Sequence, residues 1–407
     1  MSIRSRFAIL LLAGMVAAPV GCGKKASTFP TDATPALPVA STGPAVTPEE
    51  AMEFGKQFVA SIKTKDRAKF DKLMRFEDFC ARCVQDMGFS SQERAAVVKG
   101  MTSSNGGLIA DLMGTCENGS DLILLGVRSH RGRAEVVLRV FGPDGTNYFI
   151  CTPARFPDGS IAMEDLLMAA SGEPMSLTLR RLMITLLVPM ARTANNITRQ
   201  EQAILDNIGK SRTITQAIRD KDFAKALMLL KTLPREMQDE KQFVLLAVFA
   251  GQGIGDETYL QEIERFMVLF PGDPALDLMT IDYWLLKSDW KRGLECIDRL
   301  DAFVGGDPYL NQFRVSFLIK AGRLDDAKRA AEKLLVEEPK LLASYNTMAL
   351  CQVKTNDFAG AVGTYKKAIV KFGALDLDPL ASDPDYGEFV KSKEHAGLKK
   401  WAEARQK

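Results

Sequence analysis

The sequence predicts a multidomain protein in which an α+β domain, made of helices and a four-stranded antiparallel meander, precedes an all-α solenoid of helical repeats. Three observations support this prediction. Apolar residues at helical spacing give way near Leu122 to short strand-forming runs between turn clusters. From about residue 200, equivalent residues recur every 33 or 34 positions, which is typical of stacked helical pairs. The length of 407 residues accommodates about two to four domains of roughly 100–200 residues each.

The charge balance argues against one class of partner. Lysine and arginine total 53, and aspartate and glutamate total 51. Arg4 and Arg6 lie in a segment that we expect to be removed, so the mature chain has 51 of each and no net charge. Because nucleic-acid binding depends on neutralising phosphates, we expect no nucleic-acid partner. Two histidines, His130 and His395, make a His-rich metal site or a His-based triad hard to build, so no cofactor is expected.

Residues 1–21 have the layout of a secretory signal peptide. Two arginines precede an apolar run over 7–18, and this run is shorter than the ~20 residues needed to span a bilayer. Cys22 follows a glycine, and the junction resembles the lipobox of bacterial lipoproteins, although Pro19 stands where that family usually has leucine. The resemblance implies cleavage before Cys22 and acylation of its thiol, hence a membrane anchor. Ordinary cleavage after Ala18 is the alternative.

The composition of residues 22–47 predicts a lipid-anchored tether. Prolines are interleaved with alanine, threonine, serine and valine, and Asp32 is the only charged residue between 26 and 48. Such a stretch cannot bury a core and is partly extended by its prolines. Gly23, rather than aspartate, follows the lipid cysteine. By analogy with lipoproteins, this implies the outer membrane, with the protein facing the periplasm.

Residues 48–196 predict the α+β domain. Thr47 and Pro48 are suited to begin a helix, and another helix is expected from Ser91. Helices followed by a meander indicate that the helices cover one face of the sheet. Residues 171–174 predict a loop and 175–194 an apolar helix that Pro189 should kink or end. The four expected strands are 122–127, 134–141, 148–154 and 161–167.

The order of elements in this domain is similar to that of the cystatin-like and NTF2-like superfamily, in which a curved sheet wraps a helical hairpin. The resemblance implies a conical pocket that serves either an enzyme or a binding module. His130, Tyr148 and Asp165 are the candidates for chemistry in such a pocket. We interpret His130 as a solvated turn residue and Asp165 as a surface residue, so catalysis is not expected.

Residues 197–373 predict helical repeats with a period of about 34. Five equivalent positions are separated by 34, 33, 34 and 34 residues, namely Ala226, Leu260, Gly293, Ala327 and Ala361. A small residue here lets the second helix of a pair approach the first. The pattern resembles the tetratricopeptide repeat, which implies antiparallel helix pairs and a concave face lined by the first helices. A generic helical bundle is the alternative, and the glycines at 251–255 predict a distorted second repeat.

Residues 374–407 predict a helical cap whose Leu398 and Trp401 pack back onto the last repeat. Four residues are candidates for lining the concave groove. Gln312 and Asn346 fall on first helices of their repeats. Lys320 and Lys354 are 34 residues apart and form either a basic line or two solvated helix ends.

Six cysteines remain besides Cys22. Cys80 and Cys83 form a C-x-x-C pair, for which a redox pair and half of a metal site are two interpretations. A structural disulfide that joins Cys80 or Cys83 to Cys116 or Cys151 is a further alternative in an oxidising compartment. Cys296 and Cys351 fall on repeat helices and are interpreted as small core residues.

Taken as a whole, the sequence predicts a binding protein and not an enzyme. It contains no phosphate loop, zincin motif or nucleophile elbow. We expect a membrane-anchored periplasmic scaffold that binds a peptide or protein through the groove of the repeats. The alternative is a small-ligand carrier or an enzyme that uses a pocket in the α+β domain.

Overall fold

The computed structural model describes residues 44–85, 91–104, 112–117, 119–142, 145–180, 206–373 and 375–406. The predicted signal peptide, Cys22, most of the tether and most of the helix predicted at 175–194 lie outside these ranges. The chain divides into two compact units, which we describe separately: a first unit, Ser5–Met279, and a second unit that contains Thr280–Lys407. Within the described ranges, we find no helix with both the length and the apolarity to cross a membrane.

The first helix, α1 (Pro48–Lys63), begins where the sequence predicts. The Thr47 hydroxyl accepts a hydrogen bond from the Glu50 N–H (3.2 Å), and the Glu50 carboxylate accepts one from the Thr47 N–H (3.0 Å). This reciprocal capping box satisfies two N–H groups that the helix itself leaves unpaired. The helices that follow are α2 (Arg67–Met74), α3 (Phe76–Cys83) and α4 (Ser91–Ser104), and a 3-10 turn, η1 (Gly114–Cys116), precedes the sheet.

The sheet is an antiparallel meander with its strands in sequence order. Its strands are β1 (Asp121–His130), β2 (Arg133–Gly142), β3 (Gly145–Arg155), β4 (Ile161–Met168) and β5 (Glu173–Pro174). The four predicted strands are confirmed, although each is longer than expected. The prediction of a loop at 171–174 is wrong in part, because Glu173 pairs with Met168 at the edge of β4.

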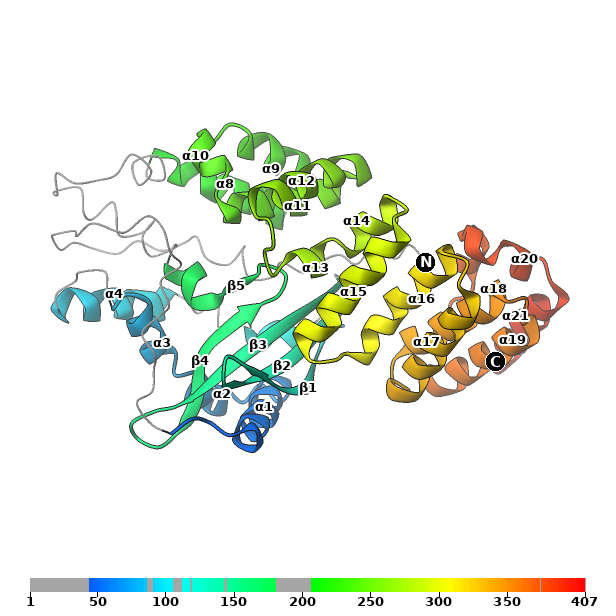
Figure 1. Cartoon of the computed structure of the whole chain (residues 1–407), viewed down its shortest axis with the longest axis horizontal. Helices are drawn as coiled ribbons and strands as arrows, with labels where there is room; N and C mark the ends of the chain where they lie inside the picture. The colour runs from blue at the N-terminus through cyan, green and yellow to red at the C-terminus, as the bar shows by residue number, and fades with distance from the viewer. Residues whose placement is uncertain are drawn as a thin grey trace. The chain divides into compact units, whose positions relative to one another are not determined.

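One face of this sheet is covered by helices, as predicted. Phe54 and Phe58 of α1 belong to the same buried core as Val136 and Leu138 of β2, and Figure 1 shows α1 and α2 on one side of the strands. Alternation along the strands sends every second side chain to that face. The first part of the chain is therefore an α+β domain, in agreement with the sequence.

An ion-pair cluster joins this domain to the helices that follow it in the first unit. The Lys241 ammonium lies 2.5 Å from the Asp273 carboxylate and 3.7 Å from that of Glu173. Lys241 and Glu173 are each only 8% exposed. Gly172, at φ 62°, lies so close that an added Cβ would be 2.3 Å from Asp273 Oδ1. The end of the sheet and the helical region are thus held together by buried charges.

The described residues from 206 onward form helices and no strands, so the predicted order of an α+β part and an all-α part is confirmed at this level. The first unit contains α8 (Ile208–Arg219), α9 (Phe223–Leu230), α10 (Arg235–Gln238), α11 (Lys241–Ile254), α12 (Asp256–Leu269) and α13 (Leu276–Met279). The second unit contains α14 (Ile281–Leu286), α15 (Trp290–Val304), η3 (Pro308–Leu310), α16 (Asn311–Lys320), α17 (Leu324–Glu337), α18 (Leu342–Lys354), α19 (Phe358–Phe372), η4 (Asp378–Ser382), η5 (Pro384–Tyr386), α20 (Gly387–Val390) and α21 (Lys393–Gln406). In the second unit each helix from α14 to α18 contacts the next one along the chain.

The same turn recurs between helices at the period of the sequence. Lys221, Ser288, Gly322 and Asn356 have positive φ angles of 59°, 55°, 74° and 58°. In each case the N–H of the following residue donates to the carbonyl five residues earlier, as Asp289 does to Trp284. At the corresponding place between α11 and α12, Gly255 has a different conformation, with φ 157°. This irregular turn is where the sequence predicts a distorted repeat.

The predicted cap also packs as expected. Leu398 of α21 is fully buried in a core that includes Ala361 and Tyr365 of α19, and Trp401 packs against the same core. The apolar side of α21 therefore closes the end of the helical region, while its lysines lie outward.

We expect Gly293→Ala to destabilise the second unit by about 1–2 kcal/mol, because a Cβ on Gly293 of α15 would lie 1.9 Å from the Phe317 ring of α16 and overpacking costs about 1–3 kcal/mol. Gly363→Ala on α19 is the matched control, since a Cβ there meets nothing within 4 Å and alanine favours a helix by roughly 1 kcal/mol. Urea unfolding measures both changes. Equal effects of the two substitutions would contradict this packing.

Candidate functional site

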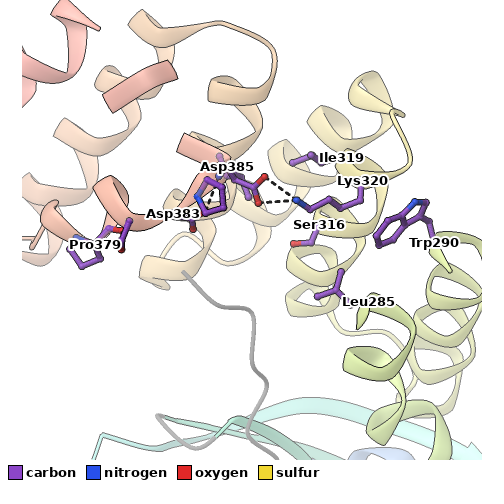
Figure 2. Close-up of a pocket in the computed structure, with 11 residues that line it drawn as sticks. Leu285, Trp290, Ser316, Ile319, Lys320, Pro379, Asp383 and Asp385 are labelled. Atoms are coloured by element: carbon purple, nitrogen blue, oxygen red, sulfur yellow. Dashed lines mark hydrogen bonds and ion pairs between the residues drawn. The ribbon is translucent and has the colours of Figure 1, made fainter. Parts of the chain in front are cut away.

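The second unit contains a pocket of about 630 Å³ between its helices and its own C-terminal segment. The helical wall is mainly apolar, with Leu285 and Trp290 on one side of the pocket and Ile319 and Lys320 of α16 facing its centre (Figure 2). The opposite wall is the segment 379–385, which includes η4 and the start of η5. The pocket thus offers an aromatic and aliphatic surface next to charged groups, a combination typical of ligand sites.

Two lysines converge on the carboxylate of Asp385, which lines this pocket together with Lys320, whereas Lys354 lies outside the described lining. Lys320 is the last residue of α16, and its Nζ lies 2.9 Å from Asp385 Oδ1 and 3.1 Å from Oδ2. Lys354 is the last residue of α18, and its Nζ lies 2.7 Å from the same Oδ1. The 34-residue spacing places the two lysines at the same position in successive helix pairs. Both lysines end their helices and stay partly exposed, as one of the two interpretations expects, and both are also paired with Asp385.

The pKa of Asp385 reflects this pairing. Partial burial by itself would raise the pKa, but hydrogen bonds from Lys354 and Lys320 outweigh it and hold the pKa below its ordinary value of 3.8. The carboxylate is therefore charged, and its ion pairs are intact, throughout the neutral range.

The lowered pKa predicts how the stability contributed by Asp385 depends on pH. A carboxyl group with a depressed folded-state pKa stabilises the fold above its unfolded-state pKa, and this contribution is lost as pH falls through the folded-state pKa. Above pH 5, we expect the free energy of unfolding of the wild type to exceed that of Asp385→Asn by about 1 kcal/mol, since surface ion pairs contribute little to stability. This difference in stability should vanish as the pH falls below the ordinary carboxyl pKa of 3.8. Thermal melts of both proteins across pH measure it, and a constant difference would contradict the assignment.

Of the four predicted groove residues, only Lys320 belongs to the described lining of the pocket. Gln312 of α16 and Asn346 of α18 are half-buried and lie outside the described lining of the pocket. The helix face is also less open than the sequence suggests, because the segment from η4 to η5 lies against it. Tyr386 and Leu380 are buried in the core formed with α19 and α21. The predicted cap thus covers part of the face that we expected to be free.

The candidates in the α+β domain occupy three different environments. His130 is exposed at the end of β1, as predicted, and Tyr148 is fully buried in β3. Asp165 is half-buried, so the prediction of a surface residue is wrong in part. Its carboxylate accepts hydrogen bonds from the Ser176 hydroxyl, the Ser176 N–H (3.2 Å) and the Leu166 N–H (2.8 Å).

Burial raises the pKa of Asp165, while hydrogen bonds from Ser176 and Leu166 act in the opposite direction. Arg82 of α3, which is 8% exposed, donates to the Glu164 carbonyl (2.8 Å) and supplies positive charge nearby. The carboxylate is therefore already held by neighbours in its own domain. The hydrogen bonds between Asp165 and Ser176 therefore link β4 to the helix that begins at Met175.

The six described cysteines are free thiols in the structure. Burial raises the pKa of Cys80 to about 12, and it also raises the pKa of Cys83 and Cys151. Thiolates are the reactive form of cysteine, so these environments favour small core residues over a redox pair. Cys296 and Cys351 are fully buried, as predicted.

Thiol counting separates these interpretations. We expect six reactive thiols in a Cys22→Ser chain that has been unfolded without reductant, and one rapidly reacting thiol in the native chain. Cys116 is the expected fast thiol, because among the described cysteines it alone is partly exposed. A count of four after unfolding would demonstrate the alternative, a disulfide in the α+β domain.

Comparison of the chain with protein-family models, curated proteins and solved structures finds no match. Within the described part of the chain, no group of three or more His, Cys, Asp or Glu side chains could hold a metal ion. Among the described residues, we take the pocket lined by Lys320 and Asp385 as the candidate site.

Proposed function

We propose that the protein is a binding module whose second unit takes up an acidic, extended segment of another protein. The observation that carries this proposal is the convergence of Lys320 and Lys354 on one carboxylate beside a pocket with an apolar wall. Charge-assisted hydrogen bonds to carboxylates are stronger than neutral ones. An acidic side chain or a terminal carboxylate is the chemistry that two ammonium groups select, and Trp290 and Leu285 suit a neighbouring apolar residue.

The repeated turn supports a stack of tetratricopeptide-like helix pairs as the scaffold for this site. In such a stack each unit buries its apolar face only against its neighbours, so that equivalent positions line up along one face. Lys320 and Lys354 are equivalent positions by this criterion, since Gly322 and Asn356 occupy the same place in their turns. A binding face built in this way extends over several helices and suits an extended peptide.

The membrane anchor remains part of the proposal. The lipobox-like junction at Cys22 and the proline-rich tether would hold the binding module near the outer membrane and raise its local concentration for envelope partners. Two or more acyl chains give stable anchoring, because each buried methylene contributes ~0.8 kcal/mol. Acyl labelling of the wild type and of Cys22→Ser tests it: membrane attachment that survives without label would overturn the anchor.

Site-specific photocrosslinking in cells tests the binding function. A photoreactive residue at Ile319, which lines the pocket, should capture partner peptides rich in aspartate and glutamate. The same residue at Lys333 is the control, because Lys333 is exposed on α17 and lies outside the pocket lining. The proposal also requires that capture at 319 falls when Lys320 and Lys354 are both changed to methionine. Equal capture from the two positions, or capture that ignores the lysines, would overturn it.

A further inference from the structure

The two lysines that pair with Asp385 carry more positive charge than this one carboxylate neutralises. Lys320 and Lys354 together contribute two ammonium groups, and both bind the single carboxylate of Asp385. The side chains remain accessible: Asp385 is 29% exposed, Lys354 26% and Lys320 42%. Because the carboxylate of Asp383 also lines the pocket, an incoming carboxylate gains most when it takes the place of Asp385.

The Asp385 side chain can leave the lysines while its backbone stays in place. The chain is fixed on one side by Leu380 and on the other by Tyr386 and Phe389, all buried in the core with α19 and α21. The Asp385 N–H is held separately by the Asp383 carboxylate at 2.9 Å. Rotation of the Asp385 side chain toward solvent breaks the bonds to Lys320 and Lys354 and leaves this core intact.

We propose that Asp385 is a built-in competitor that occupies the position of the ligand's carboxylate and thereby sets the affinity of the pocket. This inference rests on the proposed function and specifies its regulation. The segment Asp383–Pro384–Asp385 then also indicates the chemistry of the ligand: an extended acidic peptide whose carboxylate replaces that of Asp385. The affinity observed for such a ligand is reduced by the fraction of time that the lysines are occupied internally.

The test compares peptide binding by two variants of the full chain. The probe is a fluorescein-labelled peptide, Ser-Asp-Pro-Asp-Tyr-Gly, which copies residues 382–387. We expect Asp385→Asn to bind it about five- to tenfold more tightly than the wild type, as the loss of two partly exposed ion pairs suggests. Asp378→Asn is the matched control, because Asp378 pairs with Lys399 at 2.7 Å in the same segment but outside the pocket lining. It should bind like the wild type.

The outcomes separate this inference from the proposed function. The inference is supported if Asp385→Asn binds the probe more tightly than the wild type and Asp378→Asn does not. The gain must also be lost with a probe that has asparagine at both acidic positions. If the wild type binds the probe through Lys320 and Lys354 but Asp385→Asn binds no more tightly, the competitor is overturned and the binding function stands. If neither the wild type nor Asp385→Asn distinguishes the acidic probe from the neutral one, both are overturned.

A measurement on the wild type keeps the inference testable if Asp385→Asn folds poorly. Saturating probe should raise carbodiimide labelling of the Asp385 carboxylate several-fold, because the displaced side chain turns toward solvent. Labelling of Asp378, which pairs with Lys399, should not change. Unchanged labelling of Asp385 under saturating probe would overturn the competitor.

Discussion

Replacing Lys241 by methionine is expected to lower the free energy of unfolding of the first unit by about 3–5 kcal/mol. The substitution keeps most of the side-chain volume but leaves the Asp273 and Glu173 carboxylates without the ammonium that both contact. Breaking a buried ion pair in this way is costly, because the two carboxylates stay desolvated after the ammonium that faced them is lost. Urea unfolding followed by circular dichroism measures the change.

Two further variants make the Lys241 prediction specific. Lys225→Met on α9 removes an exposed lysine and should change stability by less than about 0.5 kcal/mol. Adding Glu173→Gln and Asp273→Asn to Lys241→Met should recover part of the loss, because the two carboxylate charges that faced the ammonium are then gone. A loss below about 1 kcal/mol for Lys241→Met would show that the cluster does not hold the end of the sheet to the helices.

Changing Lys320 and Lys354 together to methionine is expected to weaken binding of the acidic probe at least about 30-fold. Each lysine supplies a charge-assisted hydrogen bond, and such bonds contribute about 1.5–3 kcal/mol when they are made. The apolar wall at Trp290 and Leu285 remains, so residual binding should lose its dependence on salt. Fluorescence anisotropy at low and high ionic strength gives both quantities.

The control for the lysine pair changes two lysines elsewhere in the same unit. Lys391 and Lys393 are exposed, and they lie outside the described lining of the pocket. The double variant Lys391→Met, Lys393→Met alters the net charge by the same amount and should bind the probe like the wild type. Equal weakening by the two pairs would mean that overall charge, and not the geometry at Asp385, governs binding.

Local signals in the sequence predict most of the fold. Short strand-forming runs between turn clusters predict the meander, and Thr47 and Pro48 predict the start of α1. The 34-residue period predicts where helices end, since Ser288, Gly322 and Asn356 all adopt the left-handed conformation that closes each turn. These signals succeed because the interactions behind them span a few residues, or repeat.

Local sequence signals do not indicate which charged residues pair when they lie far apart in the chain. Spacing alone singles out Lys320 and Lys354, but nothing near them indicates Asp385, which lies 65 residues after Lys320. Lys241 likewise meets Glu173 and Asp273 only once the chain has folded. The burial of Asp165 depends on Ser176, which the short strand β5 brings back beside β4. Gln312 and Asn346 share helices with the lysines but lie on other parts of the helix surface.

A crystal structure of the chain with the acidic probe bound tests the central claim most directly. We expect a probe carboxylate within hydrogen-bond distance of Nζ of both Lys320 and Lys354, with the Asp385 side chain turned away and an apolar probe group against Trp290. A probe bound elsewhere, with Asp385 still paired to both lysines, would contradict the claim.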